Sequence, residues 1–520
     1  MEHPGTPSAT PHAAAPDYSP TDPASTGRLR HWLGGTRLSR WYAGRSRRGQ
    51  LVVELLLASA LPPLLGFVVY YLVALTPARG ALGVLFWVYF LALAATAVLI
   101  VMECARAFRF PEPPVRTPVP REQLPRVAAV IAAYLPNEQD TILDSIAAHL
   151  AVDYPADRHV VVVAYNAPEP LPIEAELVDL AAREPRLMTM RVQGSTSKVE
   201  NVTAALHQIG SEVEVIGIFD ADHHPHPKAP RRVAQWLSDA AGDKRFDMVQ
   251  GQCAIRNDDE GFVARTVTAE FATLYGVAHP GRTVVNDFGI FGGSNGWWRA
   301  PVLLELGLDE AMLTEDIDVS ARALAQGYRL GTDPRVISWE LAPTTWSAWW
   351  RQRMRWAQGW HEVSVRHFWP LMRNSRLSGI QRRGVLFLFG WRLVHPFVAT
   401  QLLPLVVAMA VAGRQRVVWD LLFFLVAAVC VNGVSLVQAL AANRLAVPGV
   451  ASRPGLYARF VLLSLLFYSE LRLSVTRGAV VRHLLGARSW DVTTRTRSAG
   501  TPVVDAPAEE RALEVVRAAS

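Results

Sequence analysis

Two carboxylates one residue apart, Asp220 and Asp222, end the largely apolar run of residues 213–219. In a β-strand, residues i and i+2 point to the same face, and open α/β sheets bind ligands beyond the carboxyl ends of their strands. Two oxygen ligands placed in this way suit Mg²⁺ or Mn²⁺, and such an ion would in turn hold a diphosphate. The pair alone also fits a solvated turn after a buried strand, so its meaning depends on the other motifs.

Segments with the patterns of strands and helices alternate around this pair. Apolar runs predict buried strands, and amphipathic segments between them predict helices. The predicted strands are residues 127–133, 159–164, 187–192, 213–219 and 246–255, and the predicted helices are 137–150, 174–183, 197–209 and 261–275. Such an alternation predicts a doubly wound, mostly parallel α/β sheet.

Long apolar segments lie on both sides of this α/β region. Half of the 520 residues are apolar, and the net charge is +6. Residues 51–75 and 81–102 are each long enough to cross a bilayer. Arginines cluster outside both segments, which places both flanks of this hairpin in the cytoplasm and favours a membrane over nucleic acid as the partner of the basic patches.

The C-terminal part begins with a segment rich in Trp and Arg, which is typical of helices in the membrane interface. Apolar runs follow at 384–413, 417–442 and 457–475. Three crossings would put the tail outside, whereas its arginines favour the cytoplasm. Glu470 and Arg472 make the last run a poor span, so the number of crossings stays open while a cytoplasmic tail is favoured.

These patterns divide the chain into six parts. The expected parts are a disordered, basic segment at 1–50, a transmembrane hairpin at 51–105, an α/β domain at 106–343, amphipathic interfacial helices at 344–383, C-terminal transmembrane helices at 384–476 and a polar tail at 477–520. This order predicts a multi-pass protein of the cell membrane with a cytoplasmic α/β domain. Three distant cysteines show no spacing for zinc or disulfides and are expected to be buried thiols.

Five further motifs accompany the carboxylate pair. They are Ala133-Tyr134-Leu135-Pro136-Asn137-Glu138, Lys198 and Asn201 in one predicted helix, Phe291-Gly292-Gly293-Ser294-Asn295-Gly296, Leu313-Thr314-Glu315-Asp316, and Gln352-Arg353-Met354-Arg355-Trp356. Together, in this order and between membrane segments, they resemble the processive, membrane-embedded family 2 glycosyltransferases, the group of cellulose, hyaluronan and chitin synthases. The resemblance covers residues 51–497.

The resemblance implies a GT-A-like fold and an inverting β-glycosyltransferase that moves a sugar from a cytosolic nucleotide-sugar donor, with a UDP-sugar favoured, to a growing polysaccharide. It implies Mg²⁺ or Mn²⁺ as cofactor, a glycan or glycolipid acceptor, a lipid bilayer around the helices, room for an accessory export subunit, and no nucleic acid. Chain growth would be coupled to translocation across the membrane.

Residue roles follow from the same resemblance. Asp316 would be the general base, and Glu315 would orient its loop. Asp222 would bind the metal, with Asp220 contacting both metal and donor. The further donor-binding residues would be Lys198, Asn166, Ala133, Tyr134, Asn137, Glu138, Arg353 and Arg355. The acceptor would meet Trp356, Gln352, Gly293 and Ser294.

Two places depart from a simple assignment. The family usually carries a carboxylate after the second strand, whereas this chain has Asn166, which weakens the case for UDP although an amide can still hydrogen-bond uracil. His223, His224 and His226 follow the carboxylate pair. One of them could complete a metal site, but solvated loop residues are the favoured interpretation.

Two other functions fit parts of the pattern. One is transfer of a single sugar to a lipid-phosphate or glycolipid acceptor, although the Gln-x-x-Arg-Trp motif favours polymerisation. The other is a membrane transporter or receptor with a cytoplasmic regulatory domain, which is disfavoured because the chain shows no clear inverted repeat and few polar residues in its spans.

Overall fold

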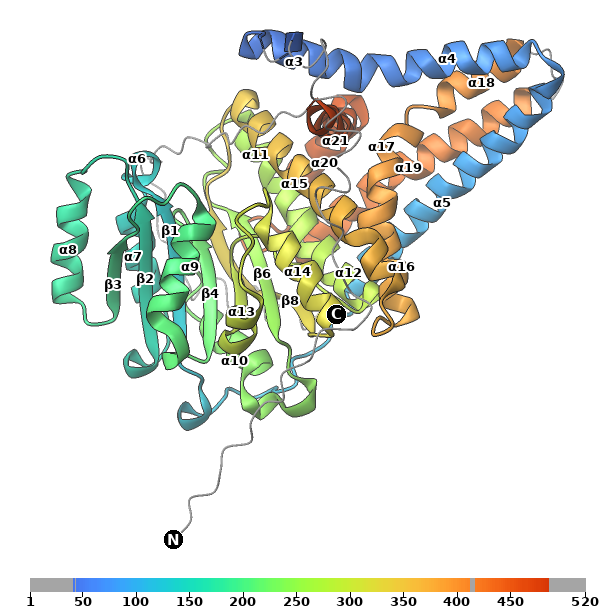
Figure 1. The fold of residues 1–520 in the computed structure, drawn as a ribbon. Helices are drawn as coiled ribbons and strands as arrows, with labels where there is room; N and C mark the ends of the chain where they lie inside the picture. Colours follow the sequence, from blue (N-terminus) through green and yellow to red (C-terminus); the bar gives the residue numbers. More distant parts are fainter. Residues whose placement is uncertain (1–40, 43, 412–416, 486–520) are drawn as a thin grey trace.

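A mixed β-sheet occupies the centre of the α/β region (Figure 1). A computed structural model describes residues 41–42, 44–411 and 417–485. The strands of the sheet are β1 Val127–Tyr134, β2 His159–Asn166, β3 Leu187–Arg191, β4 Val215–Asp220, β5 His224–Pro225, β6 Met248–Ile255, β7 Gly296–Arg299 and β8 Leu330–Glu340. Their order across the sheet is β3-β2-β1-β4-β7-β6-β8-β5.

Four of the seven strand pairings are parallel, and β7 and β5 supply the antiparallel ones. The expected mostly parallel α/β sheet is therefore confirmed. The apolar runs predicted the first four strands and β6, whereas β5, β7 and β8 were not predicted. β7 and β5 are short, with four and two residues, which is too little for a periodic signal.

Both faces of the sheet are buried, which explains why its strands are continuously apolar. In β1, Ala128 and Val130 belong to one apolar cluster, whereas Ala129 and Ile131 belong to another on the opposite face. The helices of this region are α6 Leu135–Glu138, α7 Ile142–Leu150, α8 Ile173–Arg183, α9 Lys198–Ile209, α10 Ala229–Leu237, α11 Phe262–Thr273, α12 His279–Asn286, α13 Ala300–Leu306, α14 Glu315–Gln326 and α15 Trp346–Arg373.

The predicted helix at 137–150 is interrupted. α6 ends at Glu138 and α7 begins at Ile142, because Glu138 turns back to accept a hydrogen bond from the Tyr134 amide (2.8 Å). The buried Thr141 hydroxyl donates to the Glu138 carbonyl and closes the turn between the two helices.

The remaining helices form an arm beside the sheet (Figure 1). They are α3 Arg47–Leu55, α4 Leu61–Ala74, α5 Gly80–Ala107, α16 Gly379–Val385, α17 Arg392–Val398, α18 Leu402–Val411, α19 Val417–Leu445, α20 Pro454–Leu463 and α21 Ser469–Leu484. Among the described residues, Gly49–Ala74 and Pro77–Ala107 are long and apolar enough to cross a membrane, and the bent pair Gly379–Val398 and Leu402–Val411 would make a third span.

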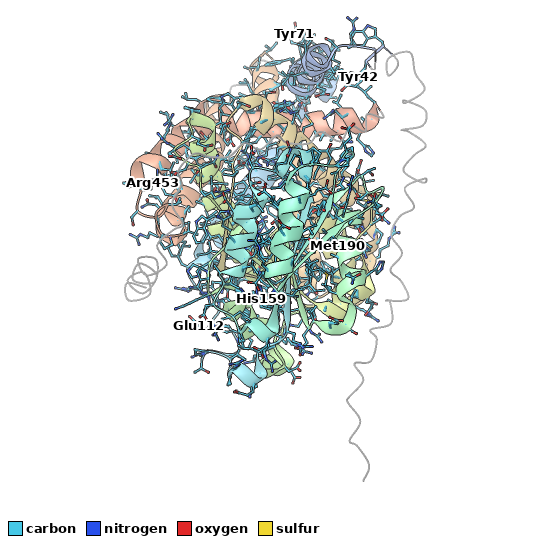
Figure 2. All side chains as sticks on the ribbon, turned by 90° about the vertical axis from the view of Figure 1, so that its left-hand side faces the viewer. Tyr42, Tyr71, Glu112, His159, Met190 and Arg453 are labelled. Carbon is cyan, nitrogen blue, oxygen red and sulfur yellow. The ribbon has the colours of Figure 1, made fainter. Side chains whose placement is uncertain are left out.

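Four helices contain a wide π-helical turn, in which one extra residue is accommodated. These turns are η1 Leu56–Ala60, η7 Leu274–Ala278, η8 Leu386–Trp391 and η9 Ser464–Tyr468. Figures 1 and 2 show that the carboxyl ends of the first strands point towards the end of the molecule that carries α3 and α4: Met190, near the end of β3, lies closer to Tyr42 and Tyr71 than does His159, the first residue of β2.

Arg477 is the first residue of the expected polar tail. It lies inside α21 and is fully buried, because its guanidinium donates to the carbonyls of Ala58 and Pro396 and pairs with Glu470. One arginine thus ties α21 to the first apolar segment and to α17. The predicted disorder at the N-terminus and most of the predicted tail concern residues 1–40 and 486–520, outside the described part of the chain.

Candidate functional site

The carboxyl ends of three neighbouring strands bring most of the predicted donor-binding residues together. In the register of the sheet, Tyr134 at the end of β1 lies beside Asn166 at the end of β2. Ala132 of β1 lies beside Asp220 at the end of β4. Since these strands are parallel, Ala133, Tyr134, Asn166 and Asp220 all reach the same edge of the sheet.

Asn201 of α9 fixes this edge through its buried side-chain amide. Its Nδ2 donates to the Ala133 carbonyl (3.2 Å) and to Asn166 Oδ1 (2.9 Å), and its Oδ1 accepts from Ser195 Oγ (2.6 Å). Asn166 Nδ2 donates to the Ser195 carbonyl (3.0 Å). The Asn166 amide is therefore held at both ends before any ligand arrives. The Ser197–Glu200 capping box starts α9 beside it.

Lys198, the first residue of α9, joins β4 to the glycine-rich loop. Its ammonium donates to Asp220 Oδ1 (2.6 Å) and to the Gly293 carbonyl (2.5 Å). Burial alone would lower the pKa of Lys198, but attraction to Asp220, Glu315 and Asp316 outweighs burial and raises it. Lys198 therefore stays charged at this edge of the sheet.

Residues 291–295 form a loop that strand β6 holds in place. Gln250, fully buried on β6, accepts from the Gly292 amide (2.7 Å) and donates to the Ser294 carbonyl (2.9 Å). The Asp220 amide in turn donates to Ser294 Oγ (3.0 Å). Asn295 has a positive φ of 51° and donates to the Val336 carbonyl of β8 (2.9 Å).

Asp316 lies directly against this loop. A Cβ atom on Gly293 would come within 2.8 Å of Asp316 Oδ2, and Gly293 has a φ of +86° that other residues rarely adopt. Burial and the neighbouring Glu315 raise the pKa of Asp316 to about 7, against the opposing effects of the Ile317 amide and Lys198. The Asp220 and Asp316 carboxylates thus belong to one site, with Lys198 and Gly293 between them.

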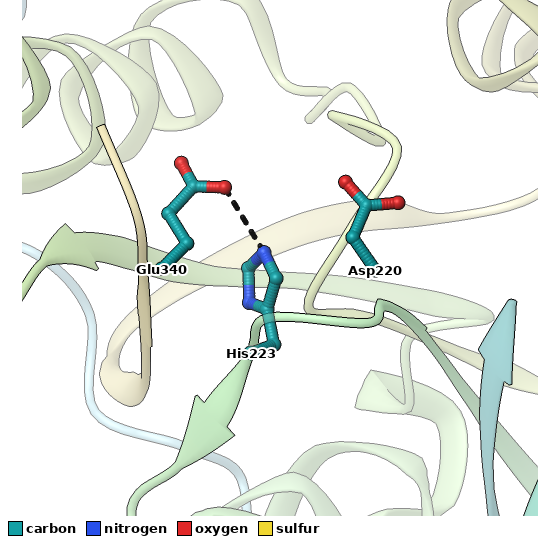
Figure 3. A group of neighbouring side chains, drawn as sticks. All are labelled: Asp220, His223 and Glu340. Carbon is teal, nitrogen blue, oxygen red and sulfur yellow. Dashed lines mark hydrogen bonds and ion pairs between the residues drawn. The ribbon is translucent and has the colours of Figure 1, made fainter. Parts of the chain in front are cut away.

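Asp220, His223 and Glu340 form a group suited to a metal ion (Figure 3). One ligand atom from each of the three lies within 4.8 Å of the others. His223 Nε2 is 3.0 Å from Glu340 Oε2, and His223 Nδ1 is 3.0 Å from Ser338 Oγ, so the ring is held by two residues of β8. Two carboxylates and an imidazole fit a divalent ion, with the nitrogen favouring Mn²⁺ over Mg²⁺.

Asp222 lies beyond the end of β4, because the strand ends at Asp220 and the next residues turn. The expectation that Asp222 binds the metal together with Asp220 stays a prediction. Asp222 is fully buried, and its Oδ2 accepts from the Leu341 amide (3.0 Å), directly after Glu340. The expectation of solvated histidines is wrong for His223 and His226, which are buried.

The Gln-x-x-Arg-Trp motif lies on α15, which packs against Thr314 just before Asp316. A Cβ atom on Gly359 would lie 2.3 Å from Thr314 Cγ2, so the two segments touch without a side chain between them. Arg353 pairs with Glu270 of α11 (Nη2 to Oε2, 2.6 Å), donates to Gln352 Oε1 (3.0 Å) and lies 4.3 Å from the centre of the Trp356 ring.

The structure does not bring Arg353 into contact with the group around Lys198, whereas Arg355 and Trp356 are partly exposed on the same helix. The site residues predicted from the sequence did not include Gln250, Glu270 or Glu340. Glu340 had a recognisable signal, because residues 336–340 repeat the pattern of an apolar strand that ends in a carboxylate. Gln250 and Glu270 lie inside apolar segments and carry no such signal.

One family model matches the part of the chain that carries most of this site. Residues 215–435 match the model of the family "Glycosyl transferase family group 2". This part of the chain is therefore similar to family 2 glycosyltransferases. The resemblance expected from the motifs is thereby confirmed.

Relatives of the glycosyltransferase domain include two poly-β-1,6-N-acetyl-D-glucosamine synthases. The protein of Staphylococcus epidermidis RP62A is 25% identical over 258 residues, which cover 49% of this chain and 60% of that protein. The protein of Staphylococcus aureus MSSA476 is 27% identical over 256 residues, covering 49% and 59%. The match thus spans about 60% of the length of these relatives.

Two solved structures share similarity with the glycosyltransferase domain. A mannosyltransferase of Pyrobaculum calidifontis in complex with GDP-Man and Mn²⁺ is 19% identical, with a TM-score of 0.48 over 78% of this chain and 100% of that one. Staphylococcus aureus TarS 1–349 in complex with UDP-GlcNAc is 13% identical, with a TM-score of 0.35 over 69% and 92%.

Gly293→Ala should inactivate the glycosyltransferase domain without unfolding it. The new Cβ would collide with Asp316 Oδ2, and the positive φ would cost about 1–2 kcal/mol. Gly327→Ala is the matched control, because Gly327 has a φ of +88° and open space around it. Sugar transfer and melting temperature should be measured for both variants. Equal activity of the two would show that the contact with Asp316 does not matter.

Sugar transfer should depend on pH through Asp316. Only the ionised carboxylate accepts a proton, and the pKa of Asp316 is raised to about 7. As pH falls below this value, kcat/KM should drop by about tenfold per pH unit, and it should level off above it. Circular dichroism over the same range controls for unfolding. A flat profile between about pH 5.5 and 8 would contradict the assignment of this residue as the base.

Proposed function

We propose that this protein is an inverting glycosyltransferase that adds sugars from a nucleotide-diphosphate donor to a growing β-linked glycan. The observation that carries the proposal is the meeting of Asp220, Lys198 and Asp316 around one glycine of a rigid loop. A cation and a candidate metal group lie on one side of Gly293, and a carboxylate with a pKa near 7 lies on the other. The cation and the candidate metal group would bind the diphosphate leaving group, and the Asp316 carboxylate would receive the proton of the attacking hydroxyl.

The reaction assigns one task to each part of the site. Asp316 takes the proton of the acceptor hydroxyl as its oxygen forms a bond to the anomeric carbon. The bond from that carbon to the donor phosphate breaks, and the diphosphate leaves with the electron pair. Lys198 offsets part of the negative charge that develops there. A single displacement of this kind inverts the anomeric carbon.

Asp220, His223 and Glu340 would hold the divalent cation, and the ion, when bound, would supply positive charge for the diphosphate. Asp222 would keep the end of β8 in place through its bond to the Leu341 amide. The Ala133, Tyr134 and Asn166 edge would face the nucleotide base. With Asn137 and Glu138 on α6 at the same strand end, these residues supply the expected donor pocket.

The donor and the acceptor follow from the relatives. Both named relatives are synthases of an N-acetylglucosamine polymer. UDP-N-acetylglucosamine is therefore the first donor to test, and an N-acetylglucosamine oligomer is the first acceptor. Product sizing separates the two enzymatic alternatives, because products that carry one added sugar would indicate transfer to a lipid or glycan without polymerisation.

The apolar helices support a membrane location for this chemistry. Two candidate spans precede the α/β domain, and the bent pair Gly379–Val398 and Leu402–Val411 follows it. The carboxyl ends of the strands point towards α3 and α4 (Figure 1). Residues 106–343 would form a cytoplasmic catalytic domain, with 51–105 and 384–476 as its membrane segments and 344–383 at the interface. Product would then leave the site next to the bilayer.

Asp316→Asn should reduce transfer by about 10²–10⁴-fold, because the amide cannot accept the proton. Donor binding should stay within twofold of the parent, since the nucleotide lies on the Asp220 side. Glu310→Gln is the control, an exposed acidic residue in the loop before α14. Radiolabelled UDP-N-acetylglucosamine measures both binding and transfer. An active Asp316→Asn protein would refute the proposed base.

Glu340→Gln should weaken Mn²⁺ binding by about tenfold or more, since loss of groups that build a metal site typically has this effect. Electron paramagnetic resonance of free Mn²⁺ measures the affinity without any turnover. Exposed Glu112→Gln serves as the control. If Asp222→Asn lowers the affinity and Glu340→Gln does not, the metal would be held by the Asp220–Asp222 pair instead.

A further inference from the structure

A row of aromatic rings connects the Gln-x-x-Arg-Trp helix with the loop beside Asp316. The Trp356 ring of α15 lies 6.4 Å from Phe271 of α11, and Phe271 lies 5.3 Å from Tyr275 in the wide turn η7. The Tyr275 hydroxyl is 3.0 Å from where a Cβ atom on Gly292 would lie. Rings of this kind offer apolar faces on which sugar rings can stack.

One face of Trp356 is occupied by protein. The guanidinium carbon of Arg353 is 4.3 Å from the centre of the ring, and Arg353 is almost fully buried. A ligand can therefore use only the other face of the indole. Arg353 does more than fill space, because a planar cation that stacks on an indole fixes the orientation of the ring.

Glu270 holds the guanidinium of Arg353 in its orientation. This carboxylate, 6% exposed, accepts from Arg353 Nη2 (2.6 Å) and from the Tyr468 hydroxyl (2.9 Å), and it lies 3.4 Å from Arg472 Nε of α21. Burial alone would raise the pKa of Glu270, but Arg353 and Arg472 outweigh it and lower the pKa. Trp349 completes the group by donating from Nε1 to the Tyr468 hydroxyl (3.0 Å).

The packing of α15 on Thr314 places this arrangement beside the proposed base. Gly359 touches Thr314, two residues before Asp316, and Trp356 precedes Gly359 by three residues on the same helix. Residues three apart lie on one face of a helix, about 4.5 Å apart along its axis. A sugar stacked on the other face of Trp356, which is partly exposed, would therefore lie close to the segment that carries Asp316.

We propose that Glu270 is a positioning residue for the acceptor glycan: through Arg353 it holds the indole of Trp356 with one face open to a sugar ring. Tyr468 and Arg472 tie the same carboxylate to η9 and α21, so the C-terminal helices share in positioning the ring. This inference rests on the proposed function, because it assumes that the acceptor is a glycan.

The test uses the full-length protein in lipid nanodiscs and a β-1,6-linked N-acetylglucosamine pentamer as acceptor. Glu270→Gln preserves the shape of the side chain but removes its charge. We expect pentamer binding, measured by quenching of tryptophan fluorescence, to weaken about tenfold, with a matching rise in the acceptor KM. The KM for UDP-N-acetylglucosamine and its slow hydrolysis without acceptor should be unchanged.

Arg353→Lys should reproduce the loss of pentamer binding, because lysine keeps the charge but loses the planar stacking group. The double variant should lose no more than either single one, since both changes act on the same ring. Two controls match the changes. Arg373→Lys alters a similar stack on the exposed Trp369 of the same helix, 5.7 Å from the ring centre, and Glu103→Gln breaks a buried ion pair with Arg282 far along the chain.

The outcomes separate this inference from the proposed function. The positioning role would be overturned if Glu270→Gln bound the pentamer normally. It would also be overturned if this variant lost donor hydrolysis and acceptor binding equally, because a merely destabilised protein behaves in that way. Failure of the unmodified protein to bind the pentamer would also overturn it. Pentamer binding that depends on Glu270, in a protein that consumes no nucleotide sugar, would leave the inference standing and reject the proposed transferase.

Discussion

A single ammonium group, that of Lys198, holds the candidate site together. It bonds a carboxylate at the end of β4 and a carbonyl in the loop before β7, and it is attracted to the two acidic residues that begin α14. Three segments that are far apart in the sequence therefore converge on one charge. Each carboxylate near it would be costly to bury alone, and the lysine offsets that cost for the whole group. The loop, the strand end and α14 are positioned with respect to one another as a consequence.

The same principle operates between the α/β region and the helical arm. Glu270 is shared by Arg353 of α15 and Arg472 of α21, and Glu54 of the first apolar segment lies 3.2 Å from Arg482 of α21. Charges that look unfavourable in apolar helices are thus bonded to partners inside the protein. Glu470 and Arg472, which made the last apolar run a poor membrane span, both serve as such partners. α21 connects the other helices through polar bonds, in keeping with its charged sequence.

The sequence predicted the sheet and the main motifs because their signals are local. Buried parallel strands read as continuous apolar runs, and the convergence of Asp220, Lys198 and Asp316 followed from their places at strand ends and helix starts. The failures have physical causes too. The strand ends at Asp220, two residues before Asp222, so the alternation of side chains along a strand does not extend to Asp222. Glu340 ends an apolar strand pattern in the sequence, but its place beside His223 depends on a contact between distant segments. The same is true of the place of Gln250 beside the glycine-rich loop, and no local pattern encodes either contact.

The wide turn η7 changes how the sequence around it must be read. A turn of this type contains one residue more than an ordinary helical turn, so the side chains before and after Leu274–Ala278 are offset by about 100° around the axis. The segment from Phe262 to Asn286 is one continuous rod of backbone with two separate helical phases. A helical wheel drawn with one period for the whole segment would therefore give Phe271 and the residues of α12 incorrect positions around the helix axis relative to one another. Gly281 has no side chain, which lets α12 touch the backbone of Glu103 in α5. Removing a single residue at the η7 turn would restore one helical phase and would rotate Gly281 away from α5.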